Sequence, residues 1–97
     1  MSFNKLTPAE VERLALLSEE CGEAVQAIGK ILRHGYNSNY GNGDTNREAL
    51  HREIGDILGV IEMMTEAGDL DGKTLTFYQT DKLRRVQPYL HHQKKTP

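Results

Sequence analysis

Apolar residues recur every three or four positions along two long segments of this chain, and this spacing constrains the fold more than any other feature. The first segment runs from Val11 to Leu32 and the second from Leu50 to Met64. A three-four period places the apolar side chains on one face of an α-helix. Each segment is therefore predicted to form an amphipathic helix that buries one side.

The first helix has sequence signals at both ends. Thr7 is the expected N-cap, Pro8 occupies the first helical position, and Glu10 stands where a capping-box side chain reaches back to the cap. At the other end, Gly35 suits the left-handed conformation that commonly follows a helix. The sequence therefore predicts one long helix between Thr7 and Gly35.

A polar, glycine-rich stretch, YNSNYGNGD at residues 36–44, is predicted to be a loop between this helix and the next. Thr45 and Glu48 repeat the capping-box spacing at the start of the second helix, and Gly68 is expected to end it. A third helical segment of weaker periodicity follows, which Pro88 is expected to end or kink. Its expected inward side chains are Leu75, Tyr78, Leu83 and Val86.

The sequence contains no strand-like alternation of apolar and polar residues, so the predicted fold class is all-α. With 97 residues, the chain is predicted to form a single domain over 1–97, with frayed ends at 1–6 and 91–97. Three amphipathic helices are too few to close a four-helix core within one chain, and a second copy would complete it. We therefore expect a helical bundle that assembles as a homodimer or homotetramer.

Composition restricts the classes of binding partner and the cellular compartment that we expect for this protein. The formal net charge of −2 provides no positive field to attract nucleic acid. The N-terminus lacks the apolar run of a signal peptide, and no stretch approaches the roughly 20 apolar residues of a membrane span. Cys21 is the single cysteine, which excludes an intramolecular disulfide, and its place on the apolar seam predicts a small buried thiol. These features favour a cytoplasmic protein without nucleic-acid or membrane partners.

The acidic pairs within EECGE and EIGD lie beside the apolar faces of the two long helices rather than opposite them. Glu20 and Glu23 are three apart on the first helix, and Glu53 and Asp56 are three apart on the second. Antiparallel packing of the helices would bring all four carboxylates together. Two unit charges about 5 Å apart at an effective dielectric near 20 repel by roughly 3 kcal/mol, so such a cluster requires cations or protonation.

Oxygen-only ligands select a hard divalent ion, and Mg²⁺ or Mn²⁺ would leave coordination positions open for phosphate oxygens. A di-iron site is not expected, because only Glu48 and His51 have the required Glu-x-x-His spacing. Lys30 and Arg33 lie beyond the carboxylates on the first helix, which favours a phosphate-ester substrate. The alternative interpretation of the acids is two solvated helix faces with intrahelical ion pairs.

The order of EECGE and then EIGD on two consecutive amphipathic helices resembles the signature of the MazG-like, all-α nucleoside triphosphate pyrophosphohydrolases. That signature is Glu-Glu-x-x-Glu, a variable gap, and Glu-x-x-Asp. The resemblance spans roughly residues 10 to 90 and includes the small and apolar residues around the acids. The gap of 29 residues between Glu23 and Glu53 is long, and the glycine-rich loop accounts for the excess.

The resemblance implies hydrolysis of a nucleoside triphosphate between its α and β phosphates, giving a monophosphate and pyrophosphate in a house-cleaning role. Glu19 would be a catalytic base or a ligand of a second metal, and Lys82 and Arg85 resemble phosphate-contacting residues of the family. Lys30 would be a further phosphate contact. The catalytic Mg²⁺ ligands that the resemblance implies by position are Glu20, Glu23, Glu53 and Asp56.

Two other functions remain open at this point. The related phosphoribosyl-ATP pyrophosphohydrolases of histidine synthesis have similar acidic motifs and a comparable chain length, and substrate competition would distinguish them. A non-catalytic, metal-binding helical interaction module would use the same residues without turnover. Thermal stabilisation by Mg²⁺ in the absence of hydrolysis would indicate such a module.

Overall fold

The computed structural model describes residues 3–39 and 43–94. Helix α1 spans Pro8–His34, α2 spans Asn46–Glu66 and α3 spans Gly72–Arg85, and a short 3₁₀-helix, η1, follows at Gln87–Tyr89. No strand occurs within the described ranges, so the all-α prediction is confirmed. None of the helices in this part of the chain is long and apolar enough to cross a membrane.

The predicted start of α1 is confirmed. The Thr7 hydroxyl accepts a hydrogen bond from the Glu10 backbone N–H at 3.1 Å, and the Glu10 carboxylate accepts one from the Thr7 N–H at 2.7 Å. Gly35 caps the other end with a φ of 87°, a conformation that favours glycine, but its ψ of 167° lies outside the left-handed helical region. The chain therefore leaves α1 in an extended direction rather than through the expected left-handed cap.

The limits of α2 and α3 follow the same chemistry. The Thr45 hydroxyl accepts a hydrogen bond from the Glu48 N–H at 3.1 Å, and α2 ends just before Gly68, whose φ is 89°. The Asp71 carboxylate caps α3 by accepting from the Thr74 N–H at 2.9 Å. Helix α3 ends before Pro88, as predicted.

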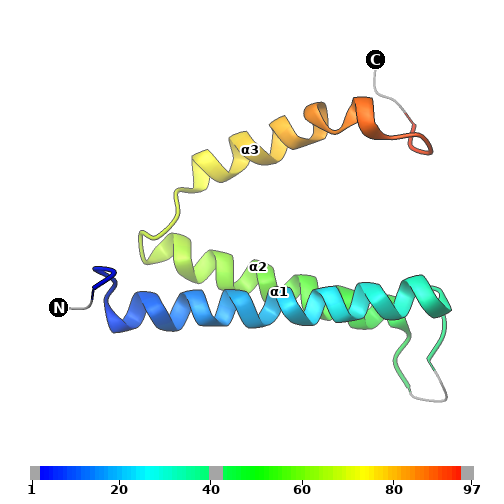
Figure 1. The fold of residues 1–97 in the computed structure, drawn as a ribbon, viewed down its shortest axis with the longest axis horizontal. Helices are drawn as coiled ribbons and strands as arrows, with labels where there is room; N and C mark the ends of the chain where they lie inside the picture. Colours follow the sequence, from blue (N-terminus) through cyan, green and yellow to red (C-terminus); the bar gives the residue numbers. More distant parts are fainter. Residues whose placement is uncertain (1–2, 40–42, 95–97) are drawn as a thin grey trace.

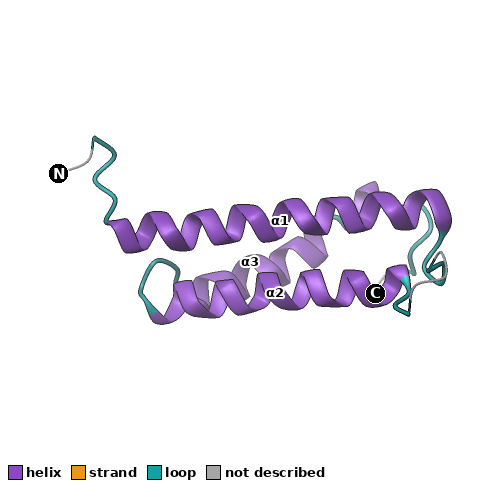
Figure 2. Cartoon of the chain, turned by 90° about the horizontal axis from the view of Figure 1, so that it is seen from below, coloured by secondary structure: helices purple, strands orange, loops and turns teal. Residues whose placement is uncertain are grey.

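Helices α1 and α2 pack side by side along most of their length as an antiparallel hairpin (Figures 1 and 2). Two of the buried side chains, Ala24 and Ala27, are small, which allows the helix axes to approach closely. The Arg13 guanidinium binds the Asp69 carboxylate through two hydrogen bonds of 2.6 and 3.0 Å, joining α1 to the turn after α2. The apolar side chains buried in this hairpin are Ala24, Ala27, Val60 and Met64.

Helix α3 turns away from the hairpin instead of packing along it (Figure 1). The radius of gyration is 17.0 Å, whereas a compact chain of this length has a value of about 13 Å. Tyr78 and Leu83 are 58% and 65% exposed, and Leu75 is 36% exposed. The prediction that these side chains point inward is wrong for the single chain, because α3 has no partner helix to cover them.

The predicted burial along α1 is also only partly correct. Helix α2 covers a narrow strip of α1, and Cys21 lies outside this strip and is exposed, so the buried thiol is a wrong prediction for the single chain. The wider apolar face of α1 remains uncovered, and a single neighbouring helix cannot cover a face of that width. Its exposed members are Val11, Leu14, Val25, Ile28 and Leu32.

Candidate metal centre

The two acidic pairs meet near the middle of the α1–α2 hairpin. Glu20 and Glu23 project from α1, and Glu53 and Asp56 project from α2. One carboxylate oxygen from each of these four residues can be chosen such that all lie within 4.8 Å of one another. The antiparallel packing therefore produces the juxtaposition that the helical spacing predicted.

Burial differs within this group of four, which we call the carboxylate cluster. Glu20, Glu23 and Glu53 are half-buried, whereas Asp56 is exposed. The cluster thus has one open side toward solvent and one side against the helix pair. A site of this kind is accessible to a ligand while being partly protected from screening by salt.

The cluster raises the pKa values of two of its own members. Burial raises the pKa of the Glu20 carboxyl above its ordinary value, and the charges of neighbouring carboxylates, Asp56 foremost, raise it further. The pKa of Glu53 is raised first by its hydrogen bond with Glu23 and then by burial. Negative charge is therefore concentrated here beyond what the nearby cations offset.

Two carboxylate oxygens of the cluster are closed off from solvent and have no hydrogen-bond partner in the described part of the chain. They are Oε2 of Glu20, on α1, and Oε2 of Glu53, on α2. Buried polar atoms are nearly always satisfied, so this pair indicates a missing ligand. A hard divalent cation would supply the partner for both oxygens, and the all-oxygen donor set fits such an ion.

A pocket of about 330 Å³ adjoins the cluster, and we call it the carboxylate pocket. Lys30 lines this pocket, about two turns along α1 from Glu23, and makes no ion pair with any described residue. A cation beside a cluster of carboxylates suits a metal-bound polyanion. The lining consists of Glu23, Gln26, Ala27, Lys30, Asn46, Ala49 and Glu53.

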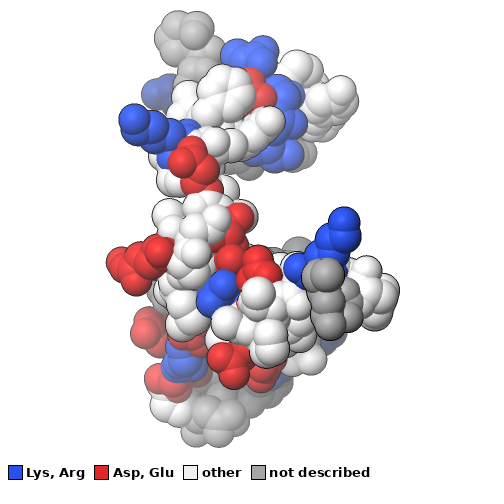
Figure 3. Space-filling model, turned by 90° about the vertical axis from the view of Figure 1, so that its left-hand side faces the viewer, with Lys and Arg blue, Asp and Glu red and all other residues white. Residues whose placement is uncertain are grey.

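The other predicted site residues lie outside the cluster. Glu19 is exposed on α1, and its negative charge contributes to the raised pKa of Glu20. Lys82 and Arg85 line a separate pocket of about 260 Å³ on α3 with Val86 and Tyr89. The single chain does not bring these two cations to the carboxylates, because α3 extends away from the hairpin (Figure 3).

Asn46 is a residue of this region that the sequence analysis did not single out. It is 8% exposed, lines the carboxylate pocket, and its side-chain N–H₂ donates to the Gly35 carbonyl at 3.0 Å. The available signal was an asparagine directly after the cap Thr45, a position typical of turn and cap chemistry. That signal indicates local structure only, so the long-range contact to Gly35 could not be read from it.

The family model described as the MazG nucleotide pyrophosphohydrolase domain matches residues 10–91. Searches of curated proteins and of solved structures gave no match. The matched range includes all four members of the carboxylate cluster.

Proposed function

Because the chain belongs to the MazG nucleotide pyrophosphohydrolase family, we propose that it hydrolyses nucleoside triphosphates between the α and β phosphates. The products would be a nucleoside monophosphate and pyrophosphate, and the role would be removal of surplus or non-standard nucleotides. Family membership supports nucleotide pyrophosphohydrolase activity in general. The finer proposal is carried by four carboxylates within 4.8 Å, which include two buried oxygens without partners.

The cofactor in this proposal is Mg²⁺, with Mn²⁺ as the alternative ion. When bound, such an ion neutralises phosphate charge and lowers the pKa of a water molecule. The protein's own contribution is to hold the four carboxylates on two packed helices, so that little rearrangement is needed for binding. The residues that would hold the ion are Glu20, Glu23, Glu53 and Asp56.

Glu19 is the proposed general base, with a role as ligand of a second metal as the alternative. It is next to Glu20 in sequence but does not belong to the cluster, so its carboxylate is not needed to hold the first ion. In the reaction, the oxygen of a water molecule bonds to a phosphorus of the scissile anhydride. The bond from that phosphorus to the bridging oxygen breaks, and the water proton passes to the carboxylate.

Three cations are proposed to bind substrate phosphates. Lys30 is already beside the cluster, whereas Lys82 and Arg85 could act on it only from the α3 of another copy. Charge favours that arrangement, because α1 and α2 together carry ten acidic and five basic residues, while α3 carries one acidic and four basic residues. We therefore propose a homodimer, or a homotetramer built from it, in which α3 covers the hairpin of a partner.

The proposed reaction is tested by measuring pyrophosphate release from a panel of standard and modified nucleoside triphosphates in the presence of Mg²⁺. Glu53→Gln removes one charge and one ligand with little change in shape, so release should fall by at least about 100-fold. Glu62→Gln is the matched control, because Glu62 is an exposed residue of α2 outside the cluster. This control should release pyrophosphate at the wild-type rate.

The two competing functions give different results in the same experiment. If the folded wild type releases no pyrophosphate from any triphosphate with Mg²⁺ or Mn²⁺, the proposed reaction is wrong. Hydrolysis of phosphoribosyl-ATP alone would then identify the histidine-synthesis activity. Stabilisation by Mg²⁺ without hydrolysis of any of these compounds would identify a non-catalytic metal-binding module.

A further inference from the structure

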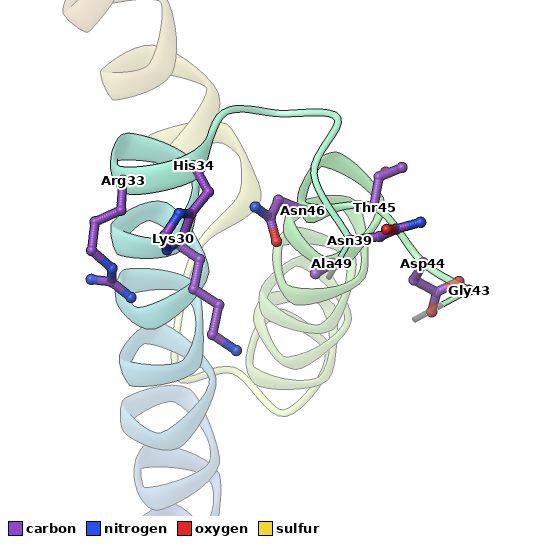
Figure 4. Close-up of a pocket in the computed structure, with 9 residues that line it drawn as sticks. All are labelled: Lys30, Arg33, His34, Asn39, Gly43, Asp44, Thr45, Asn46 and Ala49. Atoms are coloured by element: carbon purple, nitrogen blue, oxygen red, sulfur yellow. The ribbon is translucent and has the colours of Figure 1, made fainter. Parts of the chain in front are cut away.

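A second pocket, of about 510 Å³, adjoins the carboxylate pocket at the loop end of the hairpin, and we call it the distal pocket (Figure 4). The two pockets share the lining residues Lys30, Asn46 and Ala49, so they lie next to each other along the hairpin. Arg33 and His34, in the last turn of α1, line only the distal part. A ligand whose one end reaches the carboxylates could therefore place its other end beside Arg33.

The described chain around the distal pocket is held in place by hydrogen bonds between the loop and the start of α2. The side chain of Asn46 donates to the Gly35 carbonyl at 3.0 Å, and its backbone N–H donates to the Ser38 carbonyl at 2.9 Å. The Arg47 N–H donates to the Tyr36 carbonyl at 2.8 Å, and the Arg47 guanidinium lies 4.3 Å from the centre of the Tyr36 ring. This wall is therefore preformed in the absence of a ligand.

The N-terminus of α2 opens on the distal pocket, but its backbone donors are already used. The N–H groups of Asn46 and Arg47 bind loop carbonyls, the N–H of Glu48 binds the Thr45 hydroxyl, and that of Ala49 binds the Thr45 carbonyl. An anion in this pocket would therefore depend on cationic side chains rather than on the free N–H groups of a helix end.

Arg33 is the arginine that lines the distal pocket and could take this role beside Lys30. Arg13, Arg52, Arg84 and Arg85 all bind aspartates, and Arg47 stacks on Tyr36. Arg33 has no ion pair and no stacking contact with any described residue. Its Nη1 lies 3.4 Å from the position that a Cβ on Gly29 would occupy, so the side chain folds back along α1 in the direction of Lys30.

The acidic residue that lines the distal pocket does not neutralise Arg33. Asp44 binds the Arg52 guanidinium at 2.5 Å, which satisfies its charge. The one carboxylate among the described lining residues is thus paired with Arg52, and neither Lys30 nor Arg33 forms an ion pair with a described residue. An unpaired guanidinium with two parallel N–H donors suits a phosphate group.

We propose that the distal pocket binds a phosphate group on the sugar of the substrate, remote from the anhydride that is cleaved. The substrate class is thus a nucleotide with a second phosphate-bearing position, and Arg33 determines this specificity. The inference rests on the proposed function in one respect, namely that the polyphosphate end of the nucleotide lies at the carboxylate cluster.

A nucleobase is the other group that a pocket of this size could hold. Base recognition commonly uses an aromatic side chain as a stacking surface, and the described lining of the distal pocket includes none. Tyr36, the aromatic residue in the described part of the loop, already has one face covered by Arg47. The described lining includes two cations, two amides and a hydroxyl group, and its one carboxylate is paired with Arg52, which favours an oxyanion.

The test compares the binding of nucleoside 3′,5′-bisphosphates and the corresponding 5′-monophosphates by calorimetry in the presence of Mg²⁺. Wild type should bind at least one bisphosphate about tenfold or more tightly than its monophosphate, the effect expected for a charge-assisted hydrogen-bonded contact. Arg33→Gln should abolish this preference, and Arg33→Lys should retain part of it. Arg84→Gln is the matched control, because Arg84 lies on α3 away from both pockets and should keep the full preference.

Equal affinity of wild type for all bisphosphates and monophosphates would overturn the inference, as would a preference that survives in a folded Arg33→Gln protein. Circular dichroism of each variant establishes that it is folded. The binding measurement does not depend on hydrolysis. It can therefore contradict the proposed phosphate site without contradicting the proposed reaction, and the reverse also holds. Pyrophosphate release without a bisphosphate preference would sink only this inference, whereas a preference without release would sink only the proposed reaction.

Discussion

At the scale of single residues, the carboxylate cluster is organised for binding rather than for stability. The pKa values of Glu20 and Glu53 are raised by burial and by neighbouring carboxyl groups, so their charged forms are disfavoured in the folded chain. Each also holds one buried oxygen without a partner. A cation that binds there would offset the repulsion between the carboxylates and would also supply a partner for the two buried oxygens.

These pKa shifts predict how stability depends on pH. The folded protein binds more protons than the unfolded chain once the pH rises above the ordinary glutamate value of 4.5, so the metal-free protein loses stability as the pH increases through the raised values of Glu20 and Glu53. We expect Mg²⁺ to raise the melting temperature strongly at about pH 7.5 and only weakly near pH 4.5, because protonated carboxyls cannot bind the ion. Thermal denaturation with and without Mg²⁺ at both pH values measures this difference.

A substitution within the cluster gives a second check on the same electrostatics. Glu53→Gln removes one of the repelling charges, so the metal-free variant should melt at a higher temperature than wild type at about pH 7.5. The variant should also lose most of the stabilisation by Mg²⁺. Glu62→Gln should behave like wild type in both respects, and an equal gain of stability in that control would show that general charge reduction is the cause.

At the scale of secondary-structure elements, local capping chemistry defines the helices while function depends on how α1 and α2 pack. The reciprocal Thr7–Glu10 capping box starts α1 far along the helix from the carboxylates. The Arg13–Asp69 pair then joins this end of α1 to the turn after α2. Stability and site geometry can therefore be perturbed separately.

The capping box predicts a substitution that affects stability without affecting chemistry. Thr7→Ala leaves the Glu10 N–H without its hydroxyl acceptor, so the free energy of unfolding should fall by about 1 kcal/mol. Pyrophosphate release per folded molecule should be unchanged, because Thr7 lies outside both pockets. Urea denaturation and the hydrolysis assay measure the two quantities, and reduced turnover by fully folded protein would contradict the separation.

At the scale of the whole molecule, the open shape of the single chain leaves much apolar surface exposed to water. Much of the apolar surface of α1 and α3 is exposed, and the buried core consists of a few side chains in the hairpin. A folded chain with so little buried apolar area is marginally stable on its own. Association between copies is the simplest way to bury these surfaces.

If copies associate through α3, a charged substitution on its exposed apolar face should change the oligomeric state. Leu83 is 65% exposed in the single chain, so replacing it by aspartate should cost little in an isolated monomer but should disfavour a dimer that buries this face. Light scattering after size-exclusion chromatography should show a dimer or tetramer for wild type and a smaller species for Leu83→Asp. A monodisperse wild-type monomer would contradict the assembly.

A mixing experiment then tests whether Lys82 and Arg85 act across the interface. Glu53→Gln and a double variant, Lys82→Gln with Arg85→Gln, should each be inactive. If the cations serve a partner's cluster, random mixed dimers contain intact sites, and the mixture should recover about a quarter of wild-type activity. No recovery in demonstrably mixed dimers would contradict a role of these cations in the partner's site.

The helices and the acidic side chains of the cluster could be predicted from the sequence alone. Capping residues and three-four periodicity are local signals, and local signals are sufficient for the start of α1 and for placing Glu20 and Glu23 on one face. Two acidic pairs beside the apolar faces of consecutive helices also predicted that the four carboxylates would meet. These inferences required only the helical repeat and antiparallel packing.

Contacts between residues distant in the sequence became known only from the structure. It showed that α3 leaves the hairpin, so Leu83 and Cys21 are exposed in the single chain although periodicity favoured burial. It also linked Asn46 to Gly35 and left Arg33, which lines the distal pocket, without an acidic partner among the described residues. Periodicity specifies which face of a helix is apolar, but only the packing of the chain decides whether another element covers that face.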